Sequence, residues 1–169
     1  KDEPIQSWNP QNKFSITGAE WLPYQLLTFV TPPFPDVASG HTTFSTVAGK
    51  LLEWWFNSSK LHDPFKLVRI PNPQLLCPSL NNQYKIFSCG EFCFEPGSSE
   101  IEPTVTPKLT IVLKYNTIKE LYEDAGMSRI YGGIHWPETN VVSSELGSWV
   151  FDKVKTKFQS VFGIKSPYA

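Results

Sequence analysis

Two short segments of the sequence contain residues suited to binding a small oxyanion. The first, residues 31–45, reads TPPFPDVASGHTTFS and places Ser39, Gly40 and His41 at the start of a strongly helical pattern. The first backbone N–H groups of a helix have no partners within it, and the helix dipole favours an anion there. An anion can approach the backbone of Gly40 closely. Ser39 can donate its hydroxyl hydrogen, and His41 can exchange a proton.

The second segment, residues 126–136, reads GMSRIYGGIHW. It contains Arg129, one of only two arginines in the chain, six residues before His135. The planar guanidinium matches the oxygens of phosphate-like anions and stays charged at any working pH. A neutral His135 imidazole can bond to a phosphorus or vanadium centre. Glu138 is placed to orient that ring from behind.

Each segment also has a purely structural interpretation. Ser39 can be a helix N-cap with a solvent-exposed His41 behind it, and His135 can be a core histidine. Their joint occurrence favours the binding interpretation, because two of the three histidines lie near glycine, whereas His62 has no such context. We therefore predict that Ser39, Arg129 and these two histidines converge on one pocket, with the imidazoles within about 10 Å of each other.

Two long helices are expected to position these segments. Residues 41–57 carry apolar side chains at helical spacing and form one broad apolar face. A final helix is predicted at about 138–162, with Gly163 after it as a natural stop. A shorter helix is predicted at 20–29.

The segment that contains Arg129 is expected to be helical as well. Thr117 and Glu120 form a capping-box pair at the start of a helix over 117–125, and Gly126 is predicted to end it. A short helical turn is predicted over 127–134.

Residues 58–114 lack a helical period and are rich in Pro, Ser, Asn and Gly. Strand-like content at 84–94 and 108–114 predicts a small β-hairpin within this irregular lobe. The chain as a whole, 1–169, is long enough for one domain. We therefore predict a mainly α, single-domain fold with an irregular insertion.

Charge and hydropathy narrow the range of partners. The formal net charge is −1, so there is no electrostatic reason to expect nucleic acid or an anionic membrane as partner. No apolar run approaches the ~20 residues of a membrane-spanning helix. Residues 21–30 are too short, and Pro23 interrupts them.

The two oxyanion segments resemble signature motifs of the superfamily that joins vanadium-dependent haloperoxidases to type 2 phosphatidic acid phosphatases and bacterial acid phosphatases. The second family motif is Pro-Ser-Gly-His, and the third is Ser-Arg, five residues and then His. The matching residues are Ala38-Ser39-Gly40-His41, and Ser128-Arg129 with His135. The resemblance covers roughly residues 20–162. It implies the C-terminal part of a haloperoxidase-like helical bundle, with the oxyanion site between two helix starts.

The resemblance also implies a vanadate cofactor and a role for each matched residue. Ser39 and the N–H of Gly40 would donate to vanadate oxygens, and Arg129 would balance their charge. His41 would be the acid–base group near the apical oxygen, and His135 would be the one protein ligand to vanadium. The implied activity is oxidation of a halide by hydrogen peroxide. In a phosphatase there would be no cofactor, and His135 would attack the phosphate of a phosphomonoester.

Three departures from the family pattern affect this interpretation. Ala38 replaces the usual proline. The carboxylate expected four residues after the ligand histidine is Thr139 here, with Glu138 one place early. The family's first motif, a Lys followed by an Arg-Pro pair, is missing, because the sequence contains no Arg-Pro, and only Lys1 and Lys13 are basic residues before the Ser-Gly-His block.

The missing cations have two interpretations. A trianionic group held by one arginine and two histidines is under-compensated, and burying it would be costly. We therefore expect the chain to be a mature product or a fragment, with a second polypeptide or an upstream segment supplying the Lys and Arg-Pro. Alternatively, the domain is catalytically degenerate and serves in packing or assembly.

The three cysteines, Cys77, Cys89 and Cys93, lie within the irregular lobe. They are either free thiols of a cytoplasmic protein or part of an oxidised, extracytoplasmic loop with one bridge. The sequon Asn57-Ser58-Ser59 favours the second alternative, and a secreted location is expected.

We predict that two of the cysteines form a disulfide, or that one bonds to a partner chain, because the lobe has no obvious core of its own. Thiol titration of the denatured, unreduced protein measures this directly, with the reduced protein as the reference. Three free thiols before reduction would contradict the prediction and favour a cytoplasmic location.

Overall fold

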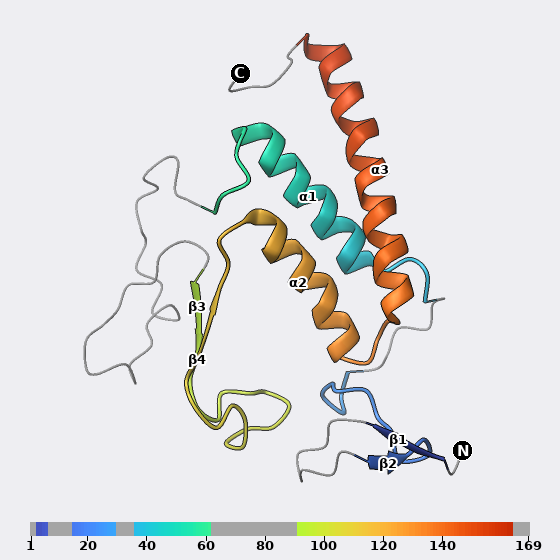
Figure 1. The fold of residues 1–169 in the computed structure, drawn as a ribbon, viewed down its shortest axis with the longest axis vertical. Helices are drawn as coiled ribbons and strands as arrows, with labels where there is room; N and C mark the ends of the chain where they lie inside the picture. The colour runs from blue at the N-terminus through green and yellow to red at the C-terminus, as the bar shows by residue number, and fades with distance from the viewer. Residues whose placement is uncertain (1–2, 7–14, 30–35, 62–90, 164–169) are drawn as a thin grey trace, which may run out of the picture.

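The structure, a computed structural model, describes residues 3–6, 15–29, 36–61 and 91–163. It contains three helices and two small antiparallel sheets (Figure 1), which confirms the predicted mainly α class. The helices are α1 (Gly40–Phe56), α2 (Ile118–Tyr131) and α3 (Pro137–Phe162). None of the described helices is both long and apolar enough to cross a membrane.

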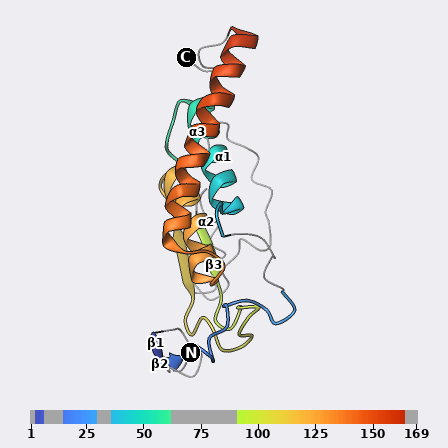
Figure 2. The same cartoon turned by 90° about the vertical axis from the view of Figure 1, so that its right-hand side faces the viewer.

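The three helices form one layer with α1 in the middle. α1 contacts both neighbours extensively, whereas α2 and α3 contact each other little. The side view shows the helices one behind another in a thin slab (Figure 2). The starts of α1 and α3 and the end of α2 lie at the same end of this layer (Figure 1).

α1 approaches its neighbours closely because glycines lie at the contact points. A Cβ atom placed on Gly147 of α3 would lie 2.8 Å from the Thr43 carbonyl oxygen of α1. A Cβ atom on Gly49 of α1 would overlap the ring of Tyr122 of α2. The two interfaces therefore depend on the absence of a side chain at these positions.

Most large apolar side chains lie outside these interfaces. Among the described residues, the buried hydrophobic side chains are Ile118, Tyr122 and Phe151. By contrast, Phe44 of α1 is 76% exposed and Trp149 of α3 is 58% exposed. Much of the apolar face predicted for the first helix is therefore exposed, although Trp55 of α1 packs edge-to-face on Phe158 of α3.

The helix boundaries agree with the sequence at α1 and α3. Gly163 ends α3 in the left-handed conformation, with φ 66°, as its glycine predicted. Asn57 ends α1 in the same conformation, with φ 49°, which asparagine tolerates better than most residues. Its presence at this position thus has a structural reason that is independent of glycosylation.

The predicted end of α2 is wrong, although its start is right. Thr117 and Glu120 form the predicted capping box. The helix continues through Gly126 to Tyr131, so the turn predicted over 127–134 is partly the same helix. Gly126 lies in close contact with α3, because a Cβ there would lie 2.4 Å from Asn140 Oδ1.

The helix predicted at 20–29 is also wrong. This segment forms isolated turns, in which Gln25 N–H donates to the Pro23 carbonyl and Phe29 N–H to the Leu26 carbonyl. The Gln25 side chain donates to the Gly132 carbonyl at 3.1 Å. Its contact with the α2–α3 turn and the interruption at Pro23 oppose a continuous helix.

Two small sheets complete the described fold. β1 (Pro4–Gln6) pairs with β2 (Ser15–Thr17), and β3 (Glu91–Phe94) pairs with β4 (Ile111–Lys114), both antiparallel. β3 and β4 fall within the two segments predicted to be strands, so a two-stranded pairing in the lobe is confirmed. Cys77, Cys89 and His62 lie outside the described residues.

We expect Gly147→Ala to destabilise the fold by about 1–3 kcal/mol, the usual cost of overpacking. The new methyl group would collide with the α1 backbone, although alanine favours a helix by about 1 kcal/mol over glycine. Urea denaturation followed by circular dichroism measures the change. Gly40→Ala is the matched control, because a Cβ there meets nothing within 4 Å. Equal stability of the two variants would contradict the close contact.

Candidate oxyanion site

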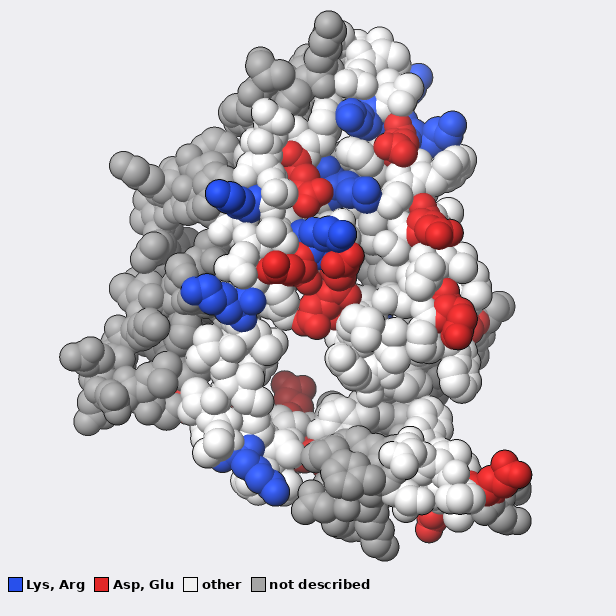
Figure 3. Space-filling model, viewed as in Figure 1, with Lys and Arg blue, Asp and Glu red and all other residues white. Residues whose placement is uncertain are grey.

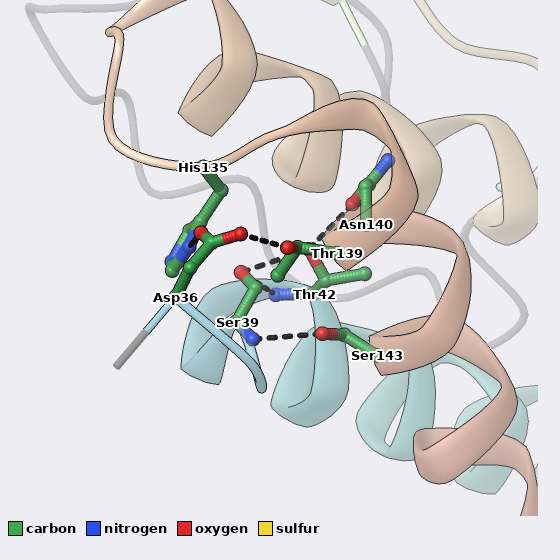
Figure 4. Close-up of polar contacts among 7 residues, drawn as sticks. All are labelled: Asp36, Ser39, Thr42, His135, Thr139, Asn140 and Ser143. Atoms are coloured by element: carbon green, nitrogen blue, oxygen red, sulfur yellow. Dashed lines mark hydrogen bonds and ion pairs between the residues drawn. The ribbon is translucent and has the colours of Figure 1, made fainter. Parts of the chain in front are cut away.

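The start of α1 is tied to α3 through Ser39 and Thr42 (Figure 4). Ser39 is the N-cap of α1, and its hydroxyl oxygen accepts the Thr42 N–H at 3.3 Å. The Ser39 backbone N–H donates to Ser143 Oγ of α3 at 2.7 Å, and Thr42 Oγ1 donates to Asn140 Oδ1 at 2.6 Å. These bonds fix the two helix starts against each other.

Ser39 thus has the structural role that one interpretation predicted for it. The residue is 0% exposed, and its hydroxyl oxygen lies 3.0 Å from Thr42 Oγ1. Gly40, next in the chain, is exposed, and the space that a Cβ would occupy there is open to at least 4 Å. The backbone at the first turn of α1 therefore has room for an anion, whereas the Ser39 hydroxyl is enclosed.

His135 is held at the start of α3 by Asp36. Its Nδ1 lies 2.7 Å from Asp36 Oδ1, and the His135 side chain is 3% exposed. The hydroxyl of Thr139 donates a short hydrogen bond to the other carboxylate oxygen. Figure 4 shows these side chains beside Ser39. One carboxylate thus links the segment before α1 to the segment before α3.

The Asp36 carboxyl is tuned by this environment. Its burial opposes ionisation, but hydrogen bonds from Thr139 and His135, the charge of His135 and the Trp136 N–H outweigh that effect. The pKa of Asp36 is therefore below its ordinary value, which favours the ionised form.

The turn between α2 and α3 brings Arg129 and His135 together. Arg129 lies in the last turn of α2, and its carbonyl accepts the N–H groups of Ile134 at 3.0 Å and His135 at 3.4 Å. Gly133 adopts φ +69°, a conformation that favours glycine, and a Cβ there would lie 3.0 Å from Pro23 Cα. The turn thus brings Arg129 and His135, six positions apart, within backbone hydrogen-bond distance.

His41 lies in the first turn of α1, and Arg129 and His135 both affect its pKa. Partial burial of its ring lowers its pKa, and the charges of Arg129 and His135 lower it further. His41 is nevertheless largely exposed. The convergence of Ser39, His41, Arg129 and His135 on one pocket, and the 10 Å limit between the imidazoles, stay predictions.

The comparisons with known proteins identify the family and the fold. The family model described as the VCPO second helical-bundle domain matches residues 1–163. The chain belongs to this family. Membership confirms the resemblance to vanadium haloperoxidases that the two motifs indicated. No curated protein matches the sequence.

Two solved structures share the fold of this VCPO second helical-bundle domain. They are the holo-type and apo-type forms of a bacterial vanadium-dependent chloroperoxidase. Each is 18% identical in sequence, with a TM-score of 0.63 over 89% of this chain. The match covers 26% of the chloroperoxidase chain, so the domain spans about a quarter of its length.

The residue that contacts the His135 ring differs from the predicted one. Glu138 is exposed in the first turn of α3, whereas Asp36 makes the contact to His135 assigned to a carboxylate. The sequence carried one signal, because Asp36 is the sole acidic residue between Glu20 and Glu53. This lone carboxylate lies three residues before the Ser-Gly-His block.

Within the described part of this VCPO domain, no cluster of three or more His, Cys, Asp or Glu could hold a metal ion. Vanadate would not need such a cluster, because the family resemblance implies one imidazole ligand to vanadium and hydrogen-bond donors to its oxygens. The described site offers His135, the open backbone of Gly40 and the guanidinium of Arg129. This donor set fits an oxyanion better than a bare cation.

We expect Arg129→Gln to raise the pKa of His41 toward its ordinary value, because removing a nearby positive charge makes protonation easier. A proton NMR titration of the His41 ring measures the shift. Lys119→Gln is the matched control, since Lys119 is an exposed cation at the other end of α2. An unchanged His41 titration in Arg129→Gln would show that the two side chains do not share a site.

Proposed function

We propose that this domain binds vanadate at the joined starts of α1 and α3, as part of a haloperoxidase that oxidises halide with hydrogen peroxide. The observation that carries the proposal is the meeting of two helix N-termini beside Arg129. A helix N-terminus carries about half a unit of positive charge. At α1 the backbone of Gly40 is exposed, although Ser39 already accepts the Thr42 N–H, and α3 begins with Pro137, which has no N–H. Two such ends and a guanidinium favour a tetrahedral oxyanion.

The residues present fit vanadate in part. His135 would be the protein ligand, Gly40 and Arg129 would contact the oxygens, and His41 would exchange a proton at the site. Vanadate, when bound, would activate hydrogen peroxide for oxygen transfer to a halide without changing its own oxidation state. The enclosed hydroxyl of Ser39 needs a small rearrangement before it can donate to the same anion.

The charges at the site indicate that a complementary segment is needed. The charges of Arg129 and Asp36 cancel, and the lowered pKa of His41 favours its neutral form at neutral pH. The described groups therefore offer little net positive charge to a trianion, whose burial without compensation is costly. A second polypeptide or an upstream segment with Lys and Arg-Pro would supply two cations.

Exposed apolar side chains near the site support the same requirement. At this end of the three helices, five large side chains are between 59% and 76% exposed: Val37, Phe44, Tyr131, Trp136 and Val141. Large apolar side chains are exposed elsewhere on the described chain too, such as Phe162 at 60%, but a contiguous exposed apolar patch beside a site is typical of a surface that another segment covers. The covering segment would also exclude water from the site, which strengthens its electrostatic interactions.

Two alternatives use the same residues differently. In an acid phosphatase, His135 would attack the phosphate of a phosphomonoester, and vanadate would bind only as an analogue. In a degenerate assembly domain, the cluster would serve packing alone. The complete burial of Ser39 favours this last alternative.

We expect residues 1–169 alone to bind vanadate weakly and to show negligible bromide oxidation with peroxide. Two missing charge-assisted hydrogen bonds, worth roughly 1.5–3 kcal/mol each, would weaken binding by about 10²–10⁴-fold. Calorimetry with vanadate, and with phosphate in parallel, measures the affinity. Adding the complementary segment should restore both binding and bromide oxidation.

His135→Ala should abolish the restored activity, and His62→Ala is the matched control because His62 has no oxyanion context. Full activity of the isolated chain would contradict the need for further cations. Activity that survives His135→Ala in the complex would exclude the haloperoxidase mechanism. Phosphomonoester hydrolysis without bromide oxidation would favour the phosphatase.

A further inference from the structure

The carboxylate of Asp36 is held at both of its oxygens. Oδ1 lies 2.7 Å from Nδ1 of His135, and Oδ2 accepts the hydroxyl hydrogen of Thr139. Thr139 is 2% exposed and His135 is 7% exposed, so both donors are shielded from water. A carboxylate that is fixed at two points cannot rotate away from the ring.

This geometry selects one form of the imidazole. An ionised carboxylate only accepts hydrogen bonds, so the Nδ1 atom of His135 must carry the proton that it donates to Asp36. The neutral ring then carries its lone pair on Nε2, the atom that can bond to vanadium or phosphorus. The contact therefore decides which nitrogen of His135 is the nucleophilic one.

Thr139 provides the second anchor of the Asp36 carboxylate. The resemblance calls for an acidic residue at position 139, and threonine stands there instead. The hydroxyl of Thr139 points at Asp36 in Figure 4 and supplies the second anchor of the displaced carboxylate. The pair thus places an acidic group beside His135 from the segment before α1.

We propose that Asp36, anchored by Thr139, is the positioning residue that fixes the tautomer and orientation of His135. This inference rests on the proposed function, because it matters chemically only if Nε2 of His135 meets an oxyanion. It differs from the sequence expectation, which gave this role to Glu138. Asp36 acts through His135 and is not itself assigned a contact with the anion.

A purely structural role is the competing explanation. Asp36 also accepts the N–H of Trp136, the N-cap of α3, whose side chain makes no capping bond. Asp36 could therefore serve only to stabilise the start of α3, as acidic groups at helix N-termini do. A structural role predicts lower stability in Asp36 variants, but no dependence of the His135 tautomer on a carboxylate.

Nitrogen NMR of the full chain with ¹⁵N-labelled histidine separates the two explanations. We expect His135 to show the Nδ1–H tautomer at a pH where the ring is neutral. Asp36→Ala should shift the tautomer ratio toward Nε2–H by about tenfold or more, because a charged acceptor is lost. The double variant Asp36→Thr, Thr139→Asp should restore the Nδ1–H form by returning a carboxylate from α3.

Glu138→Ala is the matched control and should leave the His135 tautomer unchanged. A His135→Asn spectrum assigns the signals, and circular dichroism verifies helix content. If Asp36→Ala loses its helices, the folded double variant decides: Nδ1–H supports the proposal and Nε2–H overturns it. An unchanged tautomer in folded Asp36→Ala also overturns it. The measurement needs no vanadate, so a failure to bind vanadate would contradict the proposed function alone.

Discussion

The structure depends on the close approach of α1 to its two neighbours. On α1 the buried positions are Thr42, Thr46 and Gly49, and the facing positions on α3 include Ser143 and Gly147. Small side chains let backbones approach closely, but they bury little apolar surface. The interface has a cost as well, because the buried Thr46 hydroxyl has no hydrogen-bond partner among the described residues, and such a group costs about 1–3 kcal/mol.

This arrangement explains why many large apolar side chains are exposed. Because small residues occupy the closest helix contacts, many large apolar residues of the same helices are exposed, and no second layer of described helices covers them (Figure 2). The charged residues do not compensate by forming one strong field. On the face in Figure 3, Lys and Arg are interspersed with Asp and Glu. Lys119 and Glu123 form an exposed ion pair on α2.

The sequence predicted what local physics determines. Helical periodicity located α1 and α3, and the Thr117–Glu120 capping box located the start of α2, because these signals lie within a few residues of each other. The errors arose where tertiary contacts decide. Gly126 resembles a helix stop in the sequence but is an inter-helix contact, and the segment 20–29 packs against the α2–α3 turn.

The same distinction applies to the site. The motifs identified the segments that contain Ser39, Arg129 and His135, because their spacing is a property of the sequence. They could not identify Asp36, whose partner is 99 positions away and depends on how the α1 and α3 starts meet. The motifs could not predict the burial of Ser39 either, because it involves Ser143 on another helix.

The polar contacts at the helix starts also couple the site to the helix interface. The bonds from Ser39 to Ser143 and from Thr42 to Asn140 join the starts of α1 and α3, and at this separation Asp36 lies within hydrogen-bond distance of His135. Gly147, one turn beyond Ser143, permits the same separation. A hydrogen bond weakens steeply once its atoms move apart or lose alignment. A change that spreads α1 from α3 would therefore release His135 from Asp36 before it unfolded either helix, so the geometry of the site depends on interface residues that do not touch it.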